Sequence, residues 1–112
     1  SKKKAAAQKF EAQAALHQKK QAKDELENIF YTNKDRALSL CTDIALARSL
    51  VADSEKASVL TYRSYMAGTV TFLEVDNANL TLLKNRISLA EITIERLSRL
   101  AVMGGLGRQG SL

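Results

Sequence analysis

The sequence predicts an all-α fold in the form of a long antiparallel coiled-coil helical hairpin. The chain of 112 residues has no proline and five glycines, and between Lys3 and Tyr65 it has neither. Residues that favour helices, such as alanine, leucine, lysine and glutamate, are abundant. Aromatic residues make up only 5% of the chain, which indicates thin helix-on-helix packing instead of a large globular core.

The first predicted element is one helix over residues 1–65. Its apolar positions recur every seven residues, which is the repeat of a coiled-coil seam. The crowded segment Ile29-Phe30-Tyr31, followed by Thr32 and Asn33, makes residues 29–36 the expected place for an irregularity. The seam consists of Phe30, Ala37, Ile44, Val51, Ser58 and Tyr65, joined by Leu26, Leu40 and Ala47. A further ladder lies one step round the helix and contains Leu38, Ala45, Ala52 and Val59.

A tight turn is predicted over residues 66–71. Gly68 is the first glycine of the chain, and it suits the positive φ angle that often ends a helix. Thr69 or Thr71 is expected to cap the second helix. Glu74 follows Thr71 at the spacing of a capping box.

The return helix is predicted over residues 72–103, before a glycine-rich tail over residues 104–112. Pairing about the turn places Ile87 near Val51 and Ile94 near Ile44, and leaves residues 1–34 as an overhang. The main ladder of the return helix is Leu73, Leu80, Ile87, Ile94 and Ala101, with Leu83, Ala90 and Leu97 as seam partners. A second ladder contains Val75, Leu82 and Leu89, with Ile92 nearby. Because a hairpin buries one stripe of each helix, two stripes predict self-assembly or a larger sheet of helices.

The sequence has no combination of residues suited to catalysis, and we expect no metal and no cofactor. Cys41 and His17 are 24 residues apart on one predicted helix, which is about 36 Å at 1.5 Å per residue. Glu74 and Asp76 are two residues apart and therefore diverge on a helix. The apolar runs, such as 44–47, are too short to span a membrane.

The formal net charge is +5, and the excess of lysine lies within residues 1–36. A solvated helix face explains this excess, and contact with nucleic acid or anionic lipid is the alternative. Aromatic and arginine side chains, which stack on or read bases, are scarce in this segment. We therefore expect no nucleic-acid partner.

Residues 62–75, Tyr-Arg-Ser-Tyr-Met-Ala-Gly-Thr-Val-Thr-Phe-Leu-Glu-Val, carry a resemblance to a known family. A tyrosine-bearing helix, a Gly-Thr turn and a Leu-acidic-Val opening of the return helix resemble the C-terminal periplasmic hairpin of TolC-like outer-membrane efflux proteins. Ala78, Leu80 and the Leu-Gly-rich end of the chain are similar to later parts of the same repeat. Family members often carry Leu-Asp after the valine, whereas this chain has Asp76-Asn77.

The resemblance implies a homotrimeric channel for efflux or type I secretion. Its helices form an α-barrel across the periplasm, below a β-barrel in the outer membrane. The turn would dock a periplasmic adaptor (membrane fusion) protein that serves an inner-membrane pump. The residues that the resemblance places in the adaptor-binding tip are Ala67, Gly68, Thr69, Val70 and Thr71. Those placed at the channel constriction are Tyr65, Glu74, Asp76 and Asn77.

The chain has no alternating strands of about ten residues that could line an outer-membrane pore. We therefore expect it to be a fragment of a longer exported protein, and we expect the isolated fragment to self-associate. The alternative is an independent coiled-coil scaffold hairpin that mediates protein–protein interaction, as a dimer or four-helix bundle. A basic nucleic-acid-binding helix is the third interpretation.

Overall fold

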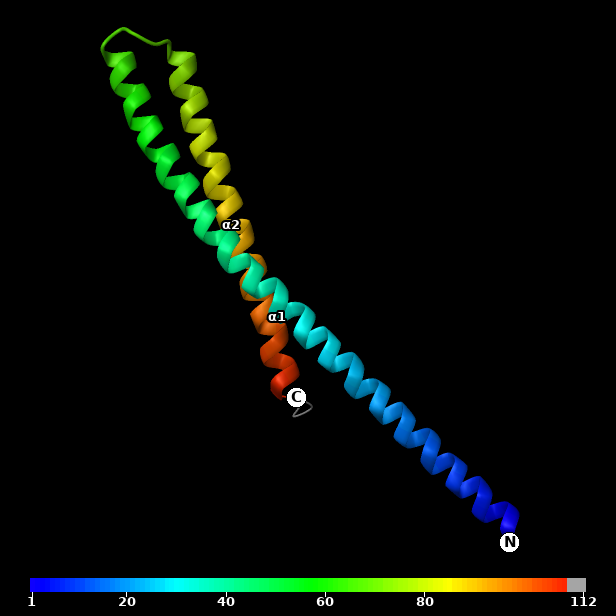
Figure 1. Ribbon diagram of the computed structural model, residues 1–112. Helices are drawn as coiled ribbons and strands as arrows, with labels where there is room; N and C mark the ends of the chain where they lie inside the picture. The colour runs from blue at the N-terminus through cyan, green and yellow to red at the C-terminus, as the bar shows by residue number, and fades with distance from the viewer. Residues whose placement is uncertain (109–112) are drawn as a thin grey trace.

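The computed structural model describes residues 1–108 as two α-helices, α1 (Lys2–Met66) and α2 (Phe72–Arg108), joined by a short turn. The helices run antiparallel along the length of α2, and the N-terminal part of α1 extends beyond them (Figure 1). The described part measures 98 × 20 × 16 Å. The predicted all-α class and the extended helical hairpin are thus confirmed.

α1 is continuous through the segment where the sequence suggested an irregularity, so that expectation was wrong. Asn33 remains within the helix because its side chain is satisfied there: Nδ2 donates to the carbonyl of Ile29 at 2.8 Å. The neighbouring rings of Phe30 and Tyr31 pack edge to face, with centroids 5.3 Å apart. Neither polar competition nor crowding therefore breaks the helix at 29–36.

The side of α1 that faces α2 follows the predicted seam over residues 37–47, whereas Tyr65 is exposed and the buried Asn33 and Ser54 were not predicted. Its buried residues occupy alternating steps of four and three along the helix, which is the coiled-coil repeat. Leu40 is fully buried, and the narrow core leaves most other apolar side chains partly exposed. The buried positions of α1 are Asn33, Ala37, Leu40, Ile44, Ala47 and Ser54.

The structure shows which of the two stripes of α2 faces α1. Val75, on the second ladder, is buried with 5% exposure, and Leu82, Leu89 and Ile92 are half-buried. The main ladder points away from α1: Leu73 is 66% exposed and Ile94 is 62% exposed. The pairing of Ile87 with Val51 and of Ile94 with Ile44, which was expected from the sequence, therefore does not bury Ile87 or Ile94.

Polar groups at the hairpin interface explain this choice. Asn79 accepts a hydrogen bond from Ser58, and Asn85 donates one to Ser54. Both asparagines lie on the α1-facing side of α2, with the second ladder. Because buried polar groups need partners, the seam of α1 selects the stripe that carries matching polar side chains over the more apolar one.

α2 extends five residues beyond the expected end at 103 and includes Gly104, Gly105 and Gly107. Each glycine costs about 1 kcal/mol in a helix relative to alanine, but Met103 and Leu106 remain half-buried and continue the packed stripe. The predicted glycine-rich tail is thus helical as far as Arg108. Its remaining residues, 109–112, lie outside the described part.

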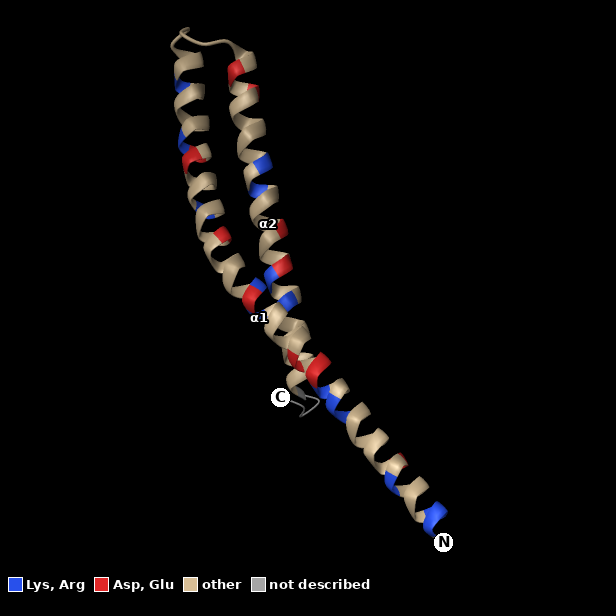
Figure 2. Ribbon diagram, turned by 45° about the vertical axis from the view of Figure 1, so that its right-hand side comes forward, with Lys and Arg blue, Asp and Glu red and all other residues tan. Residues whose placement is uncertain are grey.

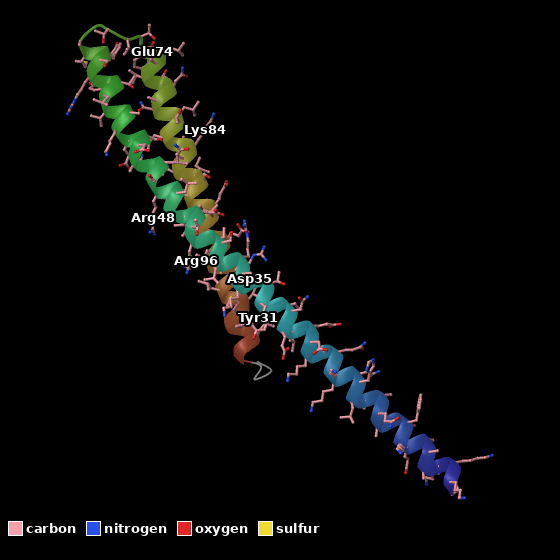
Figure 3. The ribbon with its side chains drawn as sticks, in the orientation of Figure 1. Tyr31, Asp35, Arg48, Glu74, Lys84 and Arg96 are labelled. Atoms are coloured by element: carbon pink, nitrogen blue, oxygen red, sulfur yellow. The ribbon has the colours of Figure 1, made fainter. Side chains whose placement is uncertain are left out.

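The longer α2 shortens the overhang of α1. Leu26 and Phe30 are half-buried, whereas every residue from 1 to 25 is exposed. The overhang therefore covers residues 1–25 instead of the expected 1–34. Its side chains project in all directions (Figure 3), and its lysines make it the most basic part of the molecule (Figure 2).

Candidate functional site

The turn at the tip of the hairpin is fixed by backbone hydrogen bonds. Ala67 is the C-cap of α1, and Gly68 has a φ of 78°. The amide of Gly68 donates to the carbonyl of Tyr65 at 2.9 Å, and the amide of Thr69 donates to that of Ser64 at 2.9 Å. These two bonds form a Schellman motif, so the predicted positive φ at Gly68 is confirmed.

The start of α2 is fixed by Thr71, one of the two predicted caps. The amide of Glu74 donates to the Thr71 hydroxyl at 3.4 Å, as expected from the capping-box spacing. The hydroxyl of Thr69 instead donates back to the carbonyl of Ser64 at 3.0 Å. The rings of Tyr65 and Phe72 meet edge to face with centroids 5.6 Å apart. The tip is therefore a well-defined shape held from both helices.

The predicted tip residues gather at this end of the hairpin. Ala67, Gly68, Thr69 and Thr71 are exposed, and Val70 is half-buried. Thus the backbone of the turn is ordered while most of its side chains face outward. Such a blunt, uncharged surface can bind another protein, because it presents small side chains on a rigid frame.

The predicted constriction residues are not brought together as a cluster within one hairpin. Glu74, Asp76 and Asn77 are all exposed on the first turns of α2 (Glu74 is labelled in Figure 3), whereas Tyr65 packs against Phe72. A carboxylate at the start of α2 could meet an equivalent carboxylate only from a neighbouring hairpin. The contact between Tyr65 and Phe72 was not predicted, because it forms across the turn and depends on how the turn folds.

An apolar surface without a partner lies on α2, on the side away from α1, and we call it the outer seam. It repeats every seven residues through four heptads, as a coiled-coil interface does. Its large members are 47% to 66% exposed. The outer seam consists of Leu73, Asp76, Leu80, Leu83, Ile87, Ala90, Ile94, Leu97 and Ala101.

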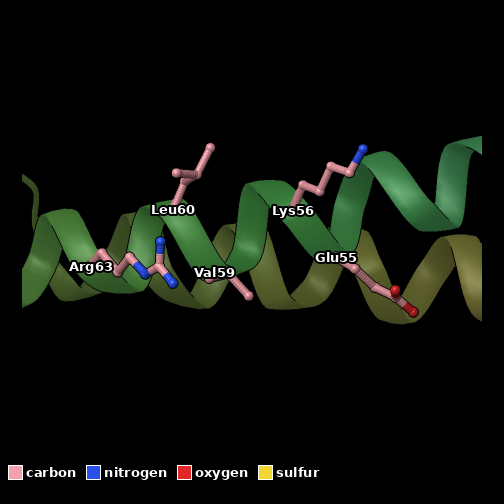
Figure 4. Close-up of a pocket in the computed structure, with 5 residues that line it drawn as sticks. All are labelled: Glu55, Lys56, Val59, Leu60 and Arg63. Carbon is pink, nitrogen blue, oxygen red and sulfur yellow. The ribbon is translucent and has the colours of Figure 1, made fainter.

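A second apolar surface lies on α1 near the tip. Val59 and Leu60 line a shallow groove of ≈ 380 Å³ that Glu55, Lys56 and Arg63 border. Figure 4 shows Lys56 and Leu60 projecting to one side of α1, and Glu55 and Val59 to the other. The groove is open to solvent and has a charged border. It therefore suits a helix that lies along it better than a small molecule that needs an enclosed pocket.

The strongest electrostatic contact joins the helices at the C-terminal half of α2. Arg36 binds Glu95 through two hydrogen bonds of 3.0 Å, and Arg99 lies 3.7 Å from the same carboxylate. The hydrogen bond from Arg36 holds the pKa of Glu95 below its ordinary value, and the charge of Arg99 adds to this. The hydrogen bond to Glu95 likewise raises the pKa of Arg36. A sequence signal for this pair is absent, because the residues are 59 positions apart.

No cluster of histidine, cysteine or acidic residues suited to a metal ion occurs within residues 1–108. Cys41 is exposed, and its sulfur accepts a hydrogen bond from Arg96 at 3.1 Å. His17 lies on the exposed overhang of α1. Neither described helix has a stretch long and apolar enough to cross a membrane.

Comparison with known protein families, with curated proteins and with solved structures gives no match for this chain.

Proposed function

We propose that this chain is a structural hairpin of a trimeric TolC-like outer-membrane channel, in which it forms part of the periplasmic tunnel wall. The observation that carries the proposal is the outer seam: a hairpin that already has its own core exposes a second seam of four heptads. An apolar helix face of that length needs a neighbouring helix. A tube of side-by-side helices provides such a neighbour on each flank.

The shape of the hairpin supports the same proposal. α2 has two apolar faces: one packs against α1, and the opposite one is exposed. A helix in the wall of a tube needs this arrangement, since it contacts one helix on each side. The length of the described part, 98 Å, suits an element that extends through a compartment.

In this proposal, the tip docks the hairpin of a periplasmic adaptor protein that links the channel to an inner-membrane pump. The tip supports docking because Ala67, Gly68 and Thr69 are exposed on an ordered turn. Glu74 and Asn77 would form an acidic and a polar ring near the closed end of the channel, whereas Asp76 lies in the outer seam, against the neighbouring helix. Such rings attract cations and narrow a pore.

The first test is the size and location of the protein in cells that produce it. An antibody against this chain is expected to detect a band several times heavier than 12.3 kDa in the outer-membrane fraction. A soluble band near 12.3 kDa would contradict the proposal. That outcome would favour the independent coiled-coil scaffold, which uses the outer seam equally well.

The second test concerns the tip. A substitution at Gly68 would strain the turn, because Gly68 has a φ of 78°. Position 67 is better suited to a substitution, because Ala67 is exposed and has a φ of −82°. A photo-crosslinking amino acid at position 67 is expected to capture a periplasmic adaptor in intact cells. The control is the same amino acid at exposed Ser49. Equal capture from both positions would count against docking at the tip.

A further inference from the structure

We propose that the outer seam of α2 binds the outer seam of a second copy of this chain, with the two α2 helices antiparallel about a two-fold axis. This goes beyond the proposed function and does not depend on it. In a channel, all hairpins point the same way, so this pairing is an alternative use of the seam by the chain on its own. The pattern of large, small and charged residues along the seam determines the orientation.

In the antiparallel pairing, every small residue in the middle of the seam lies opposite a large one, and the other large residues lie opposite each other. If Ile87 lies opposite Ala90 of the second copy, Leu80 lies opposite Leu97 and Leu83 lies opposite Ile94. Each of these contacts occurs twice because of the two-fold symmetry. A parallel pair would instead place Ala90 against Ala90, which leaves a gap in the middle of the interface.

The position of Asp76 also favours the antiparallel pair. Asp76 occupies a seam position near the start of α2 and is exposed. In a parallel pair it would face Asp76 of the second copy, and two carboxylates in one seam layer repel each other. In the antiparallel pair it faces Ala101 near the end of the partner helix, where its carboxylate reaches solvent.

Charged residues beside the seam complement each other in the same register. Lys84 and Glu91 are exposed and occupy equivalent flanking positions one heptad apart, and Lys84 projects from α2 away from α1 (Figure 3). The antiparallel register places Lys84 beside Glu91 of the second copy, and Glu91 beside its Lys84. Neither residue has an ion-pair partner within the described residues, so both are available for this contact.

The rest of the molecule permits the pairing. α1 covers the opposite side of α2, so the second copy meets no part of α1 on the outer seam. The overhang, residues 1–25, carries seven lysines and three acidic residues. An antiparallel pair sends these two basic segments to opposite ends of the dimer, which lowers their mutual repulsion.

Cysteine crosslinking tests the register directly. In a Cys41→Ser background, chains with Leu80→Cys and chains with Leu97→Cys are mixed and oxidised. A covalent dimer is expected in the mixture, because positions 80 and 97 lie opposite each other. Each variant alone is the matched control and should form little dimer, since its two cysteines would be about 25 Å apart along the axis at 1.5 Å per residue.

Two outcomes would overturn the proposal. Efficient crosslinking of either variant with itself would show a parallel pair. A monomer mass for the unmodified 112-residue chain in light scattering, at concentrations up to about 100 μM, would show that the outer seam does not bind a second copy. The antibody test of the proposed function does not depend on either outcome. The two proposals are therefore tested separately, and one can fail while the other holds.

Charge reversal supplies a second measurement. Lys84→Glu is expected to weaken the dimer about tenfold, because both symmetric ion pairs become repulsive. Adding Glu91→Lys to the same chain exchanges the two charges and should restore the original dissociation constant. Helix content by circular dichroism verifies that each variant still folds. If the double variant dissociates as readily as Lys84→Glu, the register is wrong.

Discussion

Arg99 of α2 donates a hydrogen bond of 3.1 Å from Nη1 to Oδ1 of Asn33 in α1. Asn33 is only 8% exposed and occupies a seam position between Phe30 and Ala37. Its Nδ2 donates to the carbonyl of Ile29, so both ends of the buried amide have partners. A buried amide in a coiled-coil seam specifies register, and this one fixes where the C-terminal half of α2 meets α1.

Asn33→Ala is expected to lower the free energy of unfolding by about 1–2 kcal/mol, because the variant loses a satisfied buried amide and leaves Arg99 without its acceptor. Urea denaturation followed by circular dichroism measures this change. Asn33→Leu, which places an apolar side chain of similar size in the seam, should recover the part of the loss that comes from the cavity but not the part that comes from Arg99. A change below about 0.5 kcal/mol for Asn33→Ala would show that the amide contributes little.

The ion pair of Arg36 with Glu95 predicts a pH dependence. The pKa of Glu95 is lower in the folded chain, so the pair's stabilisation is present above the unfolded carboxyl pKa of about 4.3. It is lost as the pH falls through the lower folded pKa. Melting temperatures from pH 7 to pH 2 measure this effect.

Glu95→Gln should reduce the melting temperature at pH 7 and should differ less from the unmodified chain at pH 2. The matched control is Glu11→Gln, because Glu11 lies on the exposed overhang and its loss should leave the profile unchanged. A constant difference between Glu95→Gln and the unmodified chain at every pH would contradict the assignment of the ion pair.

The turn could be predicted from the sequence because its determinants are local. Gly68 and Thr71 act on groups within a few residues of themselves, and each residue type has a specific physical role: positive φ for glycine and an accepting hydroxyl for threonine. The seam of α1 was predictable for a similar reason. Its apolar repeat is regular from Ala37 to Ala47, and the helix that carries it is uninterrupted.

The face of α2 that meets α1 could not be found by counting apolar residues. The more apolar ladder lies outside, whereas the ladder next to Asn85 and Arg99 lies inside. The choice depends on polar partners such as Ser54 and Asn33 in α1, which are 31 and 66 positions away. Likewise, glycines 104, 105 and 107 indicate a helix end locally, but packing by Met103 and Leu106 continues the helix.

The glycines of the chain are expected to respond in opposite directions to alanine. Gly68→Ala should cost about 1 kcal/mol, because Gly68 has a φ of 78°, a conformation that a Cβ disfavours. Gly105→Ala should gain about 0.5–1 kcal/mol, since Gly105 is helical and an added Cβ meets nothing within 4 Å. Thermal melts of the two variants, measured side by side, test the opposite signs. A loss of stability for both would show that the C-terminal turn of α2 requires its glycines.

Leu40 and Leu38 offer the most direct test of the narrow hairpin core. Leu40 is 0% exposed and Leu38 is 60% exposed, although they lie two residues apart on α1. Leu40→Ala should lower the free energy of unfolding by about 2–4 kcal/mol, through lost burial and the cavity left behind. Leu38→Ala changes the same atoms on the exposed side and should cost under about 0.5 kcal/mol. Urea denaturation at low micromolar concentration keeps contacts between copies small. Equal losses for the two variants would mean that the face of α1 that contains Leu38 is covered in solution, and that α1, like α2, uses a second neighbour.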